Sequence, residues 1–189
     1  MKYSTLISSA VVSAGLIFVA AHPAKADDND KDKDNNNRID VKLSGFNENP
    51  LALSSPATAQ FNAKIDRFAQ TITYELSYKD FPAPAVNPPA TNPTQSHIHF
   101  GSRSQSGGIS VFLCSNLGNG PAGTQVCPPS PGTITGVIHP ADVIGPAGQG
   151  IAAGEFTELL DAIDAGAAYV NIHTQQFAGG EIRAQIHVH

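Results

Sequence analysis

Apolar residues at every second position are the feature that most constrains this 189-residue chain. In EIRAQIHVH, residues 181–189, one parity holds Ile182, Ala184, Ile186 and Val188, and the other parity is polar. Side chains of a β-strand point alternately to opposite faces, so this pattern predicts a strand with one face on a core. Alternation or short apolar runs between turn residues predict strands at 39–46, 57–66, 68–78, 97–100, 108–113, 133–139, 167–174 and 181–189.

One segment follows a helical period instead. In GEFTELLDAIDAG, residues 154–166, apolar residues recur at i, i+3, i+4 and i+7 from Phe156 and form one stripe. Gly166 is placed to end this helix in a left-handed conformation. About eight strands with one short helix near 154–166 predict an all-β fold, for which a β-sandwich or a closed barrel is the natural architecture.

The N-terminal residues predict export. Lys2, the apolar run at 11–21 and the sequence Ala24-Lys25-Ala26 form the pattern of a secretory signal peptide over residues 1–26. The apolar run is too short for an ordinary membrane-spanning helix, so we expect no transmembrane segment after cleavage. An uncleaved anchor is the alternative. The expected location is periplasmic, at the cell surface or extracellular.

A charged segment separates the signal peptide from the folded part. DDNDKDKDNNN has no apolar residue to offset the entropy of ordering, and it lacks the Gly and distal Glu of a calcium loop. We therefore predict a disordered linker over 27–38 and one folded domain over 39–189.

Charge and motifs exclude several functions. The formal net charge of −5 becomes −7 without residues 1–26, which contain Lys2 and Lys25, and this balance argues against nucleic acid as a partner. No Gly-x-Ser-x-Gly elbow occurs, and GPAGQG at 145–150 lacks the Lys-Ser/Thr end of a phosphate loop. We predict no catalytic residue and expect a protein or surface ligand as partner.

Two cysteines, Cys114 and Cys127, bound the turn-rich segment CSNLGNGPAGTQVC. Export and the Gly/Pro/Asn-rich interval favour a structural disulfide that clamps a surface loop. The spacing does not suit a paired-cysteine zinc site, and a redox-active pair would lack the C-x-x-C arrangement.

Several of these segments together resemble a known family. LSGFNENP with SPATAQF, then HIHFG, and above all AGEFTELLDAIDAGAAYVNIHTQQFAGGEIRAQI are similar to the CHRD domain, over about residues 40–186. This domain is named from chordin, an extracellular antagonist of bone morphogenetic proteins. It also occurs in secreted proteins of bacteria, and this chain resembles those bacterial members. The resemblance implies an immunoglobulin-like or barrel-like β fold, but it transfers neither a partner nor growth-factor binding.

Histidines raise the question of a metal site. In QSHIHFG, residues 95–101, strand parity directs Ile98 and Phe100 to the core and His97 and His99 to the opposite face, outward. The same rule places histidines of the last two strands on polar faces. If HIHF pairs next to VNIHT, the histidines could converge on copper or zinc, ions that neutral imidazole suits. The candidate ligands are His97, His99, His173, His187 and His189.

A second similarity supports this hypothesis over a few residues. The copper strand of copper–zinc superoxide dismutases also carries His-x-His before an aromatic or charged residue and Gly, on a β-sandwich with a disulfide. A superoxide-dismutase-like β-sandwich is therefore an expected fold beside the immunoglobulin-like one. This chain lacks the Asp- and His-rich loop of that zinc site, so we do not predict dismutase activity. The alternative is that the histidines hydrogen-bond backbone carbonyls or a carboxylate such as Glu181.

Two functions from different classes therefore stay open. The first, which the signal peptide, the disulfide, the linker and the missing catalytic motifs favour, is an exported, non-enzymatic binding or envelope-associated module without a required cofactor. The second is a copper- or zinc-binding protein that uses histidines on neighbouring strands, with redox activity as a further alternative.

Overall fold

The structure is a computed structural model that describes residues 37–82 and 93–189. The predicted signal peptide at 1–26 and residues 27–36 of the predicted linker lie outside the described residues. Arg38, the last residue of that predicted linker, already belongs to the first strand. The strands are β1 (Arg38–Leu43), β2 (Thr58–Asp66), β3 (Thr71–Lys79), β4 (Gln95–Phe100), β5 (Gly108–Ser115), β6 (Gly132–Ile138), β7 (Ala168–His173) and β8 (Ile182–Gln185). The helices are α2 (Phe156–Asp164) and the short 3-10 helices η1 (Gly45–Asn47), η2 (Pro140–Asp142) and η3 (Ala147–Gln149).

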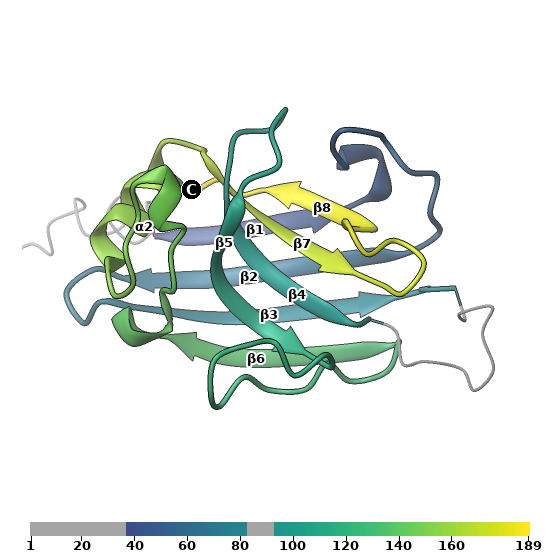
Figure 1. Cartoon of the computed structure of the whole chain (residues 1–189), viewed down its shortest axis with the longest axis horizontal. Helices are drawn as coiled ribbons and strands as arrows, with labels where there is room; N and C mark the ends of the chain where they lie inside the picture. The colour runs from purple at the N-terminus through teal and green to yellow at the C-terminus, as the bar shows by residue number, and fades with distance from the viewer. Residues whose placement is uncertain (1–36, 83–92) are drawn as a thin grey trace, which may run out of the picture.

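The eight described strands form two antiparallel sheets that face each other as a sandwich (Figure 1). One sheet has the order β1-β2-β3-β6 and the other the order β5-β4-β7-β8. The all-β prediction is confirmed, and the sandwich holds rather than the closed barrel. The sheets do not close into a barrel. Among the described residues, isolated bridges link Ile39 on β1 with Val188, and Ser44, just after β1, with Arg183 on β8.

The core lies between the sheets because each strand turns one parity inward. Phe61 on β2, Leu76 on β3, Ile98 on β4 and Val170 on β7 are all buried in it. Helix α2 lies at one end of the sandwich (Figure 1), and its apolar stripe, which includes Phe156, is buried there. Burial of such a large apolar set is the main favourable contribution to folding.

Three element boundaries differ from the expected ones by three residues or more. The first strand ends at Leu43 because the Ser44 side chain caps η1 by accepting a hydrogen bond from the Phe46 amide. Phe68, expected in a strand, is fully exposed in the turn between β2 and β3. The last strand is shorter than expected and ends at Gln185.

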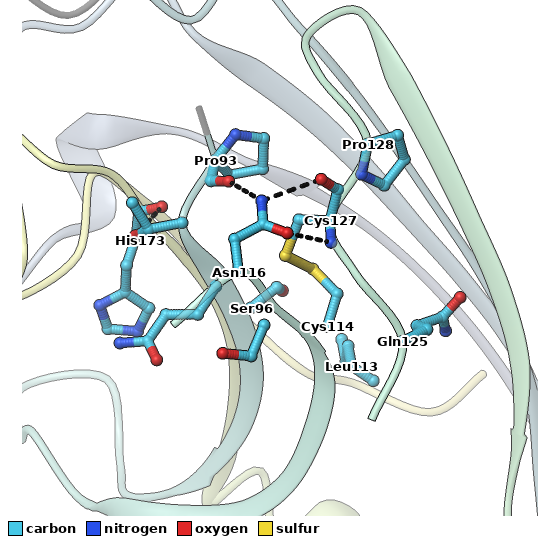
Figure 2. Close-up of a disulfide and its surroundings, with 12 residues drawn as sticks. Pro93, Ser96, Leu113, Cys114, Asn116, Gln125, Cys127, Pro128 and His173 are labelled. Carbon is cyan, nitrogen blue, oxygen red and sulfur yellow. Dashed lines mark hydrogen bonds between the residues drawn. A yellow bond between two sulfur atoms is a disulfide. The ribbon is translucent and has the colours of Figure 1, made fainter. Parts of the chain in front are cut away.

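The disulfide between Cys114 and Cys127 is confirmed. Asn116 reinforces the clamped loop (Figure 2): its Nδ2 donates to the carbonyls of Pro93 and Cys127, and its Oδ1 accepts from the Cys127 amide. The loop is thereby tied to residue 93, just before β4. Among the described residues, no helix has the length and apolar character needed to cross a membrane.

Candidate metal centre

Strand pairing in the second sheet brings histidines from two strands together. β4 pairs antiparallel with β7, so that His97 lies opposite Asn171 and His99 opposite Tyr169. His173 lies two residues along β7 from Asn171 and therefore faces the same side of the sheet. That side is the one opposite the sandwich core, as strand parity predicted.

Three imidazole rings stand close enough to share an ion. One ring nitrogen from each of His97, His99 and His173 lies within 4.8 Å of the other two. His97 Nδ1 and His173 Nε2 are 3.1 Å apart. Two nitrogens bound to one zinc ion at about 2.1 Å are at most about 4.2 Å apart, so closure around an ion needs only a small movement of the rings.

The rings are not on an exposed face. The exposed fractions are 0% for His97, 7% for His99 and 6% for His173. Loops cover this side of the sheet: the Gly107 carbonyl lies 3.0 Å from His99 Nδ1, and the Ala178 carbonyl lies 2.9 Å from His173 Nδ1. The expectation of outward histidines is therefore right about the face but wrong if it is taken to mean contact with solvent.

The two carbonyls fix which nitrogens carry protons. A carbonyl only accepts, so Nδ1 of His99 and Nδ1 of His173 must donate to Gly107 and Ala178, which leaves a lone pair on each Nε2. His97 must then donate from Nδ1 to His173 Nε2, and its own Nε2 also keeps a lone pair. Nε2 of His97 and Nε2 of His99 are buried and make no hydrogen bond. The cluster thus presents lone pairs without a matching donor.

Burial keeps all three imidazoles neutral. It lowers the pKa of His97 to about 2, with a further contribution from the neighbouring His173 and His99. Burial also lowers the pKa of His99 to about 4, against the opposing hydrogen bond to Gly107. The pKa of His173 is lowered for the same reason, against its bond to Ala178. Neutral imidazole is the form that binds metals.

A stack of side chains fixes the position of His99. Its ring lies parallel to that of Tyr169, with centroids 4.7 Å apart, and the Arg183 guanidinium carbon lies 3.4 Å from the centroid of the Tyr169 ring. Arg183 is 2% exposed and donates to the carbonyls of Ser102 and Gln105. These contacts pack the loop that contains Gly107 onto the sheet.

The suggested hydrogen bond between a histidine and Glu181 is not present. Glu181 is 1% exposed, and its two carboxylate oxygens accept from Ser55 and Thr174. This carboxylate therefore stabilises the loops around the histidine cluster rather than the rings themselves.

Two further polar residues at the site were missed by sequence reasoning. The Asn171 amide nitrogen lies 3.2 Å from Oε1 and 3.3 Å from Oε2 of Glu48, which follows η1. Burial raises the pKa of Glu48 to about 7, although the charge of Arg183 opposes this. The parity of Asn171 on its strand could have signalled it, whereas Glu48 lies in a loop and no periodicity points to it.

His187 and His189 are not part of the cluster within the described residues. Both are exposed, because the chain leaves the second sheet after β8 and runs along β1 of the first. There His189 exchanges backbone hydrogen bonds with Arg38. The structure therefore brings together three of the five candidate ligands.

Comparison with known proteins gives one match. Residues 39–186 match the model of the family described as the CHRD domain. No curated protein and no solved structure matches the chain.

Proposed function

The chain belongs to the CHRD domain family, and we propose that it is a copper- or zinc-binding protein whose ligands are His97, His99 and His173. The observation that carries this proposal is a buried cluster of neutral imidazoles in which two lone pairs have no hydrogen-bond donor.

The competing explanation is that the histidines only make structural hydrogen bonds. Such bonds account for Nδ1 of all three rings and for Nε2 of His173. An ion held by all three rings replaces the bond between His97 and His173. The structural hydrogen bonds leave Nε2 of His97 and Nε2 of His99 buried and unpaired, at a cost of about 1–3 kcal/mol each. A cation that accepts these lone pairs removes this cost, which favours metal binding over a purely structural role.

The ligand type narrows the choice of ion. Three imidazole nitrogens suit zinc and copper, whereas calcium and magnesium require oxygen ligands. Ring stacking on Tyr169 and the loop carbonyls hold the ligands in place, as the outer contacts of metal-binding histidines usually do. The sequence favoured a non-enzymatic binding module, and the geometry now favours the metal-binding alternative.

Export belongs to the same proposal. It is supported by the Cys114–Cys127 disulfide, since such bonds persist in oxidising compartments outside the cytoplasm. We propose that the mature protein begins at Asp27 and works in the periplasm, at the cell surface or outside the cell. A protein or surface ligand as a further partner is compatible with a metal held at this position.

The test begins with the full-length chain, expressed with its signal peptide and purified after export. Mass spectrometry then identifies the N-terminus of the mature protein. After removal of bound metal, titration with copper and with zinc is expected to give one equivalent bound. His99→Phe keeps a ring against Tyr169 but removes the nitrogen ligand, so we expect it to abolish binding. The matched control is His187→Ala, at an exposed histidine outside the cluster, which is expected to bind as the wild type does.

Circular dichroism verifies that both variants are folded. A wild-type protein that is purified without metal and binds neither added copper nor added zinc contradicts the proposal. So does a folded His99→Phe variant with unchanged affinity.

A further inference from the structure

We propose that Asn171 is a fourth member of the metal centre and that its side-chain oxygen, Oδ1, binds the ion directly. This inference rests on the proposed function and deepens it, because it assigns the position that three histidines leave open.

The place of Asn171 in the sheet supports this role. It lies opposite His97 on the neighbouring strand, and on its own strand the same face carries Tyr169 on one side and His173 on the other. Cβ atoms of directly opposite residues are about 4.5–5.5 Å apart. The Asn171 side chain therefore lies beside His97 and on the same face as His173 and His99, and it is 3% exposed.

The amide has a defined orientation. In its ionised form Glu48 only accepts hydrogen bonds, so the amide nitrogen of Asn171 faces Glu48, and Oδ1 points elsewhere. Gly180 restricts the amide from another side: a Cβ at this residue would lie 2.6 Å from Nδ2 and 2.8 Å from Oδ1. Glu48 and the backbone at Gly180 thus leave the amide little room to turn.

Oδ1 of Asn171 is buried and makes no hydrogen bond, which is also true of Nε2 of His97 and Nε2 of His99. All three atoms are acceptors, given the proton positions that the neighbouring carbonyls and Glu48 impose. Such atoms cannot satisfy one another, but a single cation can accept electron pairs from all of them. With Nε2 of His173, which becomes available when the ion replaces its hydrogen bond from His97, they make a set of three nitrogens and one amide oxygen. Such a set suits four-coordinate zinc, and the oxygen favours a divalent ion over monovalent copper.

The decisive variants change Asn171, which carries the proposed oxygen ligand, and Glu48, which orients its amide. Asn171→Ala removes the oxygen and is expected to weaken zinc and cobalt binding about tenfold or more and to change the visible spectrum of bound cobalt(II). In the double variant Glu48→Gln/Asn171→Asp, donor and acceptor are exchanged. The new amide at position 48 donates to one carboxylate oxygen at position 171, and the other carboxylate oxygen takes the place of the original Oδ1. We expect this variant to recover the affinity and the cobalt spectrum. Asn62→Ala, on β2 in the other sheet, is the control.

The outcomes separate this inference from the proposed function. A wild-type protein that binds no metal overturns both. A wild-type protein that binds metal, with an Asn171→Ala variant of equal affinity, overturns only the role of Asn171. Lost affinity with an unchanged cobalt spectrum, or a double variant that is folded but does not recover, also overturns it, because either result assigns Asn171 a structural role alone.

Discussion

Acidification of the metal-free protein from pH 8 to pH 5 is expected to reduce its stability through the buried histidines. Their pKa values in the folded state, about 2 for His97 and about 4 for His99, lie below the ordinary value of 6.5. At pH values between 6.5 and the folded-state pKa, these histidines are therefore protonated in the unfolded chain and neutral in the folded chain. The stabilisation is fully present above pH 6.5 and is lost as the pH falls, with His173 acting in the same direction.

The expected loss at pH 5 depends little on how low the folded values are. At 1.36 kcal/mol per pKa unit, keeping one histidine neutral 1.5 units below its ordinary pKa costs about 2 kcal/mol. His97 and His99 together therefore cost about 4 kcal/mol.

Glu48 opposes this loss. Its pKa is about 7 in the folded state and 4.5 ordinarily, so the folded chain binds a proton more readily than the unfolded chain between these values. Going from pH 8 to pH 5 then adds about 2.5 kcal/mol of stability. We expect a net loss of about 1.5 kcal/mol in the wild type and about 4 kcal/mol in Glu48→Gln, which cannot titrate.

The assay is urea unfolding followed by circular dichroism at pH 8 and pH 5, with a chelator present, and extrapolation of the free energy of unfolding to water. Equal losses in the wild type and in Glu48→Gln would mean that Glu48 does not take up a proton in the folded state over this range. A free energy of unfolding that does not fall between these pH values in Glu48→Gln would mean that burial does not keep the histidines neutral.

Three further predictions concern stability, measured by the same unfolding assay. Replacing Cys114 and Cys127 by Ser is expected to cost about 3 kcal/mol, because the unfolded chain gains the freedom of the opened loop; an unchanged midpoint in the reduced wild type would contradict this. Phe61→Ala, between the sheets, should cost about 3–5 kcal/mol, whereas Phe68→Ala, at a fully exposed position, should change stability by less than about 0.5 kcal/mol. Arg183→Lys loses the planar fork to two loop carbonyls and should cost about 2 kcal/mol; a loss below about 0.5 kcal/mol would assign the guanidinium no structural role.

Alternation in the sequence was sufficient to predict the strands and the side of the sheet on which His97, His99 and His173 lie. Ile98 is buried in the core and His97 is on the opposite face, as strand parity requires. Alternation does not identify the end of a strand, however. Phe68 fits the parity of β3, but it lies in a turn, where Asp66 accepts a hydrogen bond from the Ala69 amide.

The burial of the site could not be predicted in the same way. Whether a polar face is wet depends on loops that arrive from distant parts of the chain, and loops have no periodicity. Glu48 reaches Asn171 across 123 residues of sequence, and Arg183 reaches the Ser102 carbonyl across 81. The pairing of β4 with β7, which joins the histidines, is likewise a long-range contact that the sequence alone left as a condition.

The two loop carbonyls that orient the rings suggest how this site can vary among related sequences. A main-chain oxygen is present whatever the residue type, so the exposed Ala178 is free to be replaced, whereas an insertion or deletion beside it would displace the oxygen. Gly107 is different, because any side chain there would collide with the Phe100 carbonyl. In homologues that keep the metal centre, the segment after β7 should therefore have a constant length but a variable sequence. The glycine that corresponds to Gly107, just before β5, should be conserved.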